Sequence, residues 1–119
     1  MNPPPPPEVF LKIKDSPVET LSFGLYVAHL LFENGNGLTF SAPFRFAHED
    51  AIGNAAVCEF PLCESNLIRV LGQRVHNVGC DTDGTLDLAF ANHDRLIVYA
   101  NNPMYEAYTL FVDGQKWVV

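Results

Sequence analysis

Basic residues are scarce in this chain. Seven lysines and arginines stand against fourteen aspartates and glutamates, so the formal net charge is −7 at pH 7. Nucleic acids and anionic membrane surfaces repel a chain with this charge. The seven bases are also spread along the whole sequence instead of forming a stripe among aromatic residues. We therefore predict no nucleic-acid or membrane partner and a preference for basic proteins.

Cysteines and long apolar runs are scarce as well. The chain has three cysteines, an odd number: Cys58, Cys63 and Cys80. The first residues lack the pattern of a secretory signal. Both observations favour reduced thiols and a cytoplasmic location. Cys58 and Cys63 have no second pair beside them, which argues against zinc. No apolar run reaches the length of a membrane helix.

What is present is the composition of one folded domain. The 119 residues are 48% hydrophobic and 18% charged, which is enough to bury one core. Residues 1–8 are rich in proline, and we expect them to form an extended, disordered tail. Residues 9–119 are expected to form a single β domain. It would have two similar halves, 9–47 and 65–119, joined by a long connection over 48–64.

The two halves are suggested by an internal repeat. When residues 28–40 are shifted by 58 positions onto residues 86–98, apolar positions meet apolar ones and the polar turns coincide. Alternate residues of a strand share a face, so both copies predict a β-hairpin with one buried side. The matched pairs are Ala28 and Leu86, Leu30 and Leu88, Phe32 and Phe90, Asn34 and Asn92, Leu38 and Leu96, and Phe40 and Val98.

Further strands and turns complete a mainly β prediction. Residues 73–80 read as a strand before the Asp81–Gly84 turn, and Asp113-Gly114 predicts a type I′ hairpin turn near the end of the chain. We expect an antiparallel sheet of about seven or eight strands, with the two hairpin units side by side in one sheet. A curled sheet, a sandwich and a barrel all remain open.

Three segments outside the repeat have weaker signals. Residues 10–14 alternate apolar and polar side chains, which predicts a half-buried strand. Residues 65–72 run from Ser65, a favourable N-cap, to Gly72, a favourable helix end, and predict the one short helix. Residues 56–60 would form a short strand within the connection.

No arrangement of reactive side chains stands out. His48, Glu49 and Asp50 are adjacent, so on an extended chain they point in alternating directions and do not converge on a metal. Asp81 and Asp83 resemble part of a calcium loop, but the further oxygen ligands are missing. We predict no catalytic residue, no metal site and no cofactor, and therefore a protein that is not an enzyme.

A resemblance adds to this interpretation. LGQRV at residues 71–75, the Asp83-Gly84 turn, LDLAF at 86–90 and YEAY at 105–108 are similar to motifs of a bacterial family of small β-proteins. LTFSAPFRF at 38–46 resembles the opening of the same family. Proteins of this kind are sometimes placed among the immunity proteins that neutralise polymorphic or contact-dependent toxins. The resemblance thus implies a bacterial protein that inhibits a cognate toxin.

The prediction for function combines charge and resemblance. We expect a non-catalytic module that binds a cognate toxin or another basic protein, with an acidic surface over the partner's basic site. The expected contacts are Glu49, Asp50, Asp81, Asp83, Asp94 and Tyr105. A small-ligand-binding or enzymatic domain, with a pocket between the sheet and the connecting loop, is the alternative. A homodimer through an edge strand also remains open.

Overall fold

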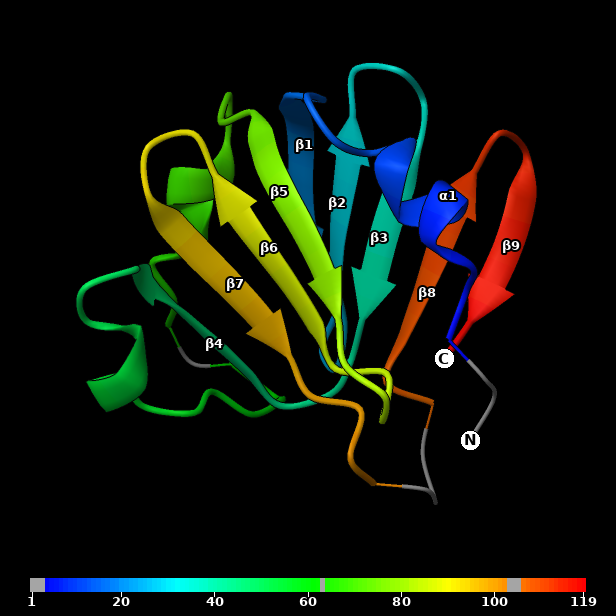
Figure 1. The fold of residues 1–119 in the computed structure, drawn as a ribbon. Coiled ribbons are helices and arrows are strands. Elements are labelled where there is room, and N and C mark those ends of the chain that lie inside the picture. Colours follow the sequence, from blue (N-terminus) through cyan, green and yellow to red (C-terminus); the bar gives the residue numbers. More distant parts are fainter. Residues whose placement is uncertain (1–3, 63, 103–105) are drawn as a thin grey trace.

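The protein is an open, two-sheet β structure with one short α-helix (Figure 1). The computed structural model describes residues 4–62, 64–102 and 106–119. In this part of the chain nine strands form two antiparallel sheets and no closed barrel. The mainly β prediction is confirmed, with one or two strands more than expected.

The first sheet has five strands in the order β1-β2-β3-β8-β9. All its neighbouring strands are antiparallel. Its members are β1 (Val18–Phe23), β2 (Ala28–Phe32), β3 (Gly37–Phe40), β8 (Tyr108–Val112) and β9 (Gln115–Val118).

The second sheet has four strands in the order β4-β7-β6-β5. It too is antiparallel throughout. Its members are β4 (Phe44–His48), β5 (Val75–Cys80), β6 (Leu86–Phe90) and β7 (Asp94–Val98).

The internal repeat is visible in the hydrogen-bonding register. Strands β1, β2 and β3 of the first half correspond to β5, β6 and β7 of the second. The first pair of strands in each half has a register shift at the same place, between Val18 and Thr20 in one and between Val75 and Asn77 in the other. The prediction of two similar hairpin units is confirmed.

The expectation that both hairpins lie side by side in one sheet is wrong. The hairpin β2–β3 lies in the five-stranded sheet and β6–β7 in the four-stranded sheet. The reason is that the halves exchange strands: β4 leaves the first half to pair with β7, and β8 leaves the second to pair with β3. Each hairpin thus gains its next neighbour from the other half.

A pseudo-twofold relation connects the starts of β1 and β5. Pro17 and Arg74, which are equivalent in the repeat, form an isolated antiparallel bridge with each other. The Val18 amide donates to the Gln73 carbonyl at 3.0 Å, and the equivalent Val75 amide donates to Ser16 at 3.1 Å. Backbone contacts between the halves are therefore themselves duplicated.

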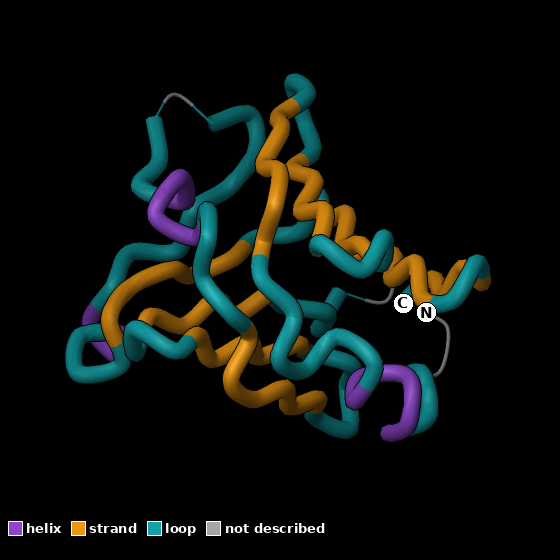
Figure 2. Tube along the Cα trace, turned by 90° about the horizontal axis from the view of Figure 1, so that it is seen from above, coloured by secondary structure: helices purple, strands orange, loops and turns teal. Residues whose placement is uncertain are grey.

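The core fills the angle between the two sheets, which Figure 2 shows from above. Both hairpins contribute alternate side chains to it, as period-two burial requires. Leu30 and Leu38 of one unit and Leu88 and Leu96 of the other are at most 1% exposed. Phe40 and Phe44 meet edge to face, with ring centroids 5.2 Å apart, where the chain passes from one sheet to the other.

The turns follow the expected chemistry. Asp113 and Gly114 both have positive φ angles, 51° and 79°, as the predicted type I′ turn between β8 and β9 needs. Gly35 and His93 occupy equivalent positions in the two repeated hairpins, with φ angles of 85° and 72°. A residue without a side chain thus serves in one turn and a histidine in the other.

The structure corrects three weaker predictions. Residues 10–14 do not form a strand, because helix α1 (Pro7–Leu11) and its following turns occupy this segment. The predicted helix over 65–72 is the 3₁₀-helix η2 (Leu67–Val70), which begins after the Ser65 hydroxyl accepts the Leu67 amide at 3.0 Å. Residues 56–60 contribute only one bridge, Cys58 to Phe44.

Two segments outside the strands complete the fold: the N-terminal segment and the connection between the two halves. Residues 4–6 lie outside any helix or strand, and Pro5 is buried; Pro7 and Glu8, which we assigned to the tail, begin α1. The connection after β4 contains the 3₁₀-helix η1 (Ile52–Asn54). Among the described residues, no helix is both long and apolar enough to cross a membrane.

Candidate functional site

Both sheets are joined at one end of the molecule, which we call the pocket end. It consists of the turns 24–27 and 81–85 and the crossovers 41–43 and 99–107, of which 103–105 lie outside the described residues. Ser41 donates its amide hydrogen to Ala107 at 3.2 Å, and Tyr99 donates to Pro43 at 3.0 Å. These bonds hold the two crossovers together.

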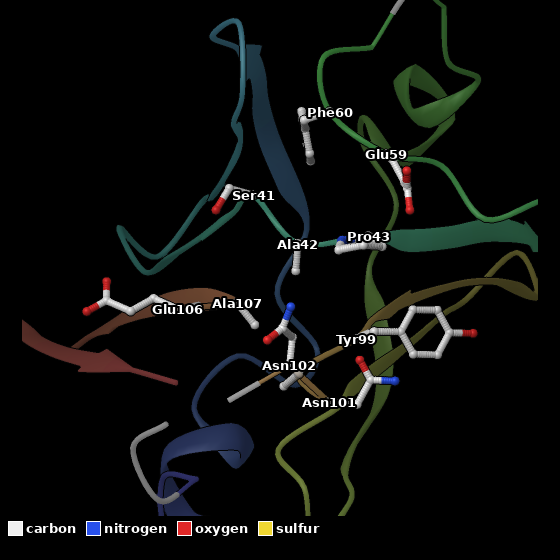
Figure 3. A pocket seen from close by; sticks show the side chains of 11 residues that line it. Ser41, Ala42, Pro43, Glu59, Phe60, Tyr99, Asn101, Asn102, Glu106 and Ala107 are labelled. Atoms are coloured by element: carbon white, nitrogen blue, oxygen red, sulfur yellow. The ribbon is translucent and has the colours of Figure 1, made fainter. Parts of the chain in front are cut away.

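A hollow of about 590 Å³ lies at the pocket end. Its walls come from both crossovers and from Glu59 and Phe60 of the connection between the halves (Figure 3). The β3–β4 crossover is short, whereas its β7–β8 counterpart is longer and supplies six of the eleven lining residues. The hollow is thus built largely where the two halves differ. The lining comprises Ser41, Ala42, Pro43, Glu59, Phe60, Tyr99, Ala100, Asn101, Asn102, Glu106 and Ala107.

The polar side chains of the hollow do not converge on one point. Figure 3 shows Glu59 and Glu106 on opposite sides of it, with Tyr99 and Glu106 extending in opposite directions. Catalysis and metal binding both need side chains within about 3 Å of a common point. Among the described residues no group of three or more His, Cys, Asp or Glu side chains is placed to hold a metal ion.

Negative charge and exposed apolar side chains meet at the pocket end. The turn between β1 and β2 presents Leu25 and Tyr26, which are 69% and 60% exposed. Asp81 is exposed in the β5–β6 turn, and Glu59 and Glu106 flank the hollow. Exposed aromatic and aliphatic residues within a charged rim are typical of protein–protein interfaces.

One basic side chain lies beside this surface. The Arg45 guanidinium is 5.9 Å from the centre of the Tyr99 ring, within cation–π range. Tyr99, which also lines the hollow, is thus in contact with a basic side chain of β4.

Two of the predicted contact residues lie at the pocket end. Asp81 is exposed, while Asp83 is half-buried and its carboxylate accepts the Thr85 amide at 2.9 Å. Thr85 in turn accepts the Ala100 amide through its hydroxyl at 3.1 Å, which ties the turn to the longer crossover. Asp81 is free to meet a partner, and Asp83 mainly shapes the turn.

Glu49 and Asp50 lie at the opposite end of the four-stranded sheet, after β4. His93 Nδ1 is 3.4 Å from Glu49 Oε1, and His48 Nδ1 is 3.5 Å from Asp50 Oδ2. The two imidazole rings have centroids 6.1 Å apart. The structure therefore separates this pair of acids from Asp81 and Asp83, because β6 runs between the two groups.

Asp94, another predicted contact, is buried and paired within the chain. Its side chain is 1% exposed, although it follows a polar turn. Arg69 donates to it at 3.4 Å and the Asn92 amide at 3.1 Å. Its charge is used within the fold, between η2 and the β6–β7 turn. The last predicted contact, Tyr105, lies outside the described residues.

A buried tyrosine joins the two sheets below the hollow. The Tyr108 hydroxyl, from β8, donates to the Gly84 carbonyl in the β5–β6 turn at 2.6 Å. The Cys80 sulfur lies 3.7 Å from the same oxygen. Burial raises the pKa of both the Tyr108 hydroxyl and the Cys80 thiol. A thiol kept protonated is a poor nucleophile, which argues for a structural role.

No family model, no curated protein and no solved structure matches this chain. The resemblance to immunity proteins therefore stays a prediction. The site stands on its own geometry, and sequence reasoning missed much of it. Glu59 and Glu106 had no signal because the hollow forms only when distant crossovers meet. Leu25 and Tyr26 did offer one, an apolar run in a turn.

Proposed function

We propose that this protein is a non-catalytic binding module whose pocket end contacts a basic protein. The proposal is carried by one observation: acidic side chains flank a hollow whose polar groups diverge, at the same end of the sheet as the exposed Leu25 and Tyr26. Polar side chains that point apart cannot act together on one reacting atom, but they can contact a partner over a wide area. Desolvated aromatic and aliphatic side chains would slow dissociation.

The partner class that we propose is a cognate bacterial toxin. This step rests on the resemblance described above and on charge. Toxins that act on nucleic acids need basic clefts for phosphate, and a chain with a net charge of −7 is attracted to such a cleft. Complementary charge speeds encounter and selects among partners. The protein would inhibit by covering the cleft.

Co-expression with a toxin encoded beside this gene tests the proposal. The expected result is rescue of growth, together with a complex that dissociates more readily as salt concentration rises. Growth arrest that persists despite expression of folded protein would count against toxin inhibition. A complex that salt does not weaken would count against the electrostatic part of the proposal.

A matched pair of variants locates the contact. Asp81→Asn and Asp50→Asn each remove one exposed negative charge, so they change long-range attraction equally. They lie at opposite ends of the molecule. We expect Asp81→Asn to weaken binding about five-fold, roughly 1 kcal/mol, and Asp50→Asn to have a smaller effect. The reverse order, measured by titration calorimetry, would move the contact to the Glu49–Asp50 loop.

A small-ligand-binding or enzymatic domain is the second candidate. The specific observation in its favour is the hollow of about 590 Å³ between the crossovers and the connection. A volume of this order is typical of small-molecule pockets. A thermal-shift screen of metabolites tests it, because a ligand that binds only the folded state raises the melting temperature. A hit whose effect Phe60→Ala abolishes would favour this candidate.

A further inference from the structure

The outer face of the five-stranded sheet is unusual for so acidic a chain. Two rows of side chains cross all five strands on this face, and they contain no carboxylate. The charged residue of the rows is Lys116, on the edge strand β9, while the exposed Glu19 lies outside the rows, at the bulge of the other edge strand β1. In Figure 2 the other described elements lie on the opposite side of this sheet. The rows are Thr20–Leu31–Gly37–Phe111–Lys116 and Ser22–His29–Thr39–Thr109–Val118.

A groove of about 280 Å³ runs through this face. Leu31 and Phe111, each 42% exposed, stand on either side of Gly37 in the same row. Gly37 has no side chain to fill the space, and a Cβ there would lie 3.1 Å from the Leu30 carbonyl oxygen. His29 is fixed at the groove by a 2.8 Å hydrogen bond between its Nδ1 and Thr39 Oγ1. Along this row a large side chain, a glycine without a side chain and another large side chain follow one another.

The repeat shows that the fold itself does not require an uncharged face. In the four-stranded sheet, the row equivalent to Leu31, Gly37 and Phe111 is Ala89, Arg95 and Ala47. Arg95 pairs there with Asp87. One outer face therefore has a charged pair at its centre and the other has an apolar groove, although the backbone pairing is the same.

We propose that this face is where two copies of the chain associate. Each copy carries a net charge of −7, so close approach is least unfavourable through a surface whose two central rows contain no carboxylate. A twofold axis places a surface against itself, and residues then contact each other reciprocally. The row suits such contact, because Leu31 of each copy fits over Gly37 of the other. Leu31 and Phe111 would supply the apolar contact.

Analytical ultracentrifugation of the full-length protein, in low and high salt, tests this proposal. The concentrations run from about 10 μM to about 1 mM, the range of dissociation constants expected for weak association. We expect a monomer–dimer equilibrium that shifts toward the dimer as salt rises, since salt screens repulsion between like-charged copies. This direction is opposite to that expected for a basic partner, so the two proposals can fail separately. A monomer at every concentration and salt would overturn the association.

Lysine substitutions locate the surface. Leu31→Lys and Phe111→Lys place charge in the groove and should weaken dimerisation at least about ten-fold. Val57→Lys is the matched control, because Val57 is 44% exposed and lies outside the sheet. A dimer that Leu31→Lys and Phe111→Lys leave intact would place the contact elsewhere, for example at an edge strand. Far-ultraviolet circular dichroism of each variant confirms that its fold is retained.

Discussion

Tyr108 shows how one residue fixes the arrangement of the two sheets. It belongs to β8 of the five-stranded sheet, yet its hydroxyl bonds to the Gly84 carbonyl in a turn of the other sheet. The side chain is 2% exposed. A buried hydroxyl is stabilising only while it can donate, since its ionised form would be both desolvated and without its hydrogen bond.

We predict a loss of stability in alkali that depends on Tyr108. Burial raises its pKa above the ordinary value of 10.0, so folding favours the protonated form. The stabilisation is complete below pH 10 and declines as pH rises toward the folded pKa, because unfolded tyrosine then releases its proton. The free energy of unfolding, from urea titrations between pH 8 and 11, should fall by up to about 1.4 kcal/mol per pH unit.

Tyr108→Phe provides the control for this prediction. The variant should lose about 1 kcal/mol at pH 7, because the Gly84 carbonyl is left unpaired. Its stability should then depend less on pH above 10 than that of the natural protein. Cys80, whose pKa burial also raises, remains in both chains and contributes to both curves. Parallel curves would contradict the assigned role of Tyr108.

At the scale of elements, α1 illustrates a competition between two periodicities. Val9, Leu11 and Ile13 alternate as a strand would, whereas Phe10 and Ile13 have the spacing of a helix face. In the structure Phe10 and Ile13 are 7% and 0% exposed, and Leu11 is 64% exposed. Pro7 at the first turn favours the helix, since its fixed φ angle suits that position.

The two periodicities predict different mutant stabilities. In a helix, Leu11→Ala should change the free energy of unfolding by less than about 0.5 kcal/mol, and Phe10→Ala should cost about 3–5 kcal/mol. In a strand with Leu11 in the core, Leu11→Ala would cost about 2–5 kcal/mol. Urea denaturation of the two variants decides between them. A large loss in Leu11→Ala would contradict the helix.

Local sequence information predicted the hairpins well and the pairing between them poorly. Asn34–Gly37 and Asp113-Gly114 determine tight turns within a few residues, so β2–β3 and β8–β9 were predictable. The pairing of β4 with β7 and of β8 with β3 depends on contacts between the halves, which no turn residue specifies. The hollow lies at those crossovers, so the same limit applies to the candidate site.

At the scale of the whole molecule, strand exchange makes the two halves one cooperative unit. Neither sheet is complete without a strand from the other half, and the Pro17–Arg74 bridge joins the edge strands. A substitution that destabilises one half should therefore destabilise the other half as well. The repeat does not create two independently stable units, although it creates two similar ones.

Unfolding should accordingly be a single transition. We predict that Leu30→Ala, in the first half, lowers the free energy of unfolding by about 2–5 kcal/mol and reduces hydrogen-exchange protection of β6 as much as that of β2. Leu88→Ala, at the equivalent position in the second half, should likewise reduce the hydrogen-exchange protection of β2 as much as that of β6. Hydrogen exchange that is accelerated in only one half would show that the two halves open separately.

Strand exchange has a consequence for the order in which the chain can fold during synthesis. When residues up to β4 have left the ribosome, β3 is paired on one side only, with β2, and β4 has no partner strand, because β8 and β7 are still to be made. Nascent first halves are therefore exposed as open β edges for the time needed to make some sixty more residues, about 3–12 s at typical elongation rates. Chaperone demand should concentrate in that interval.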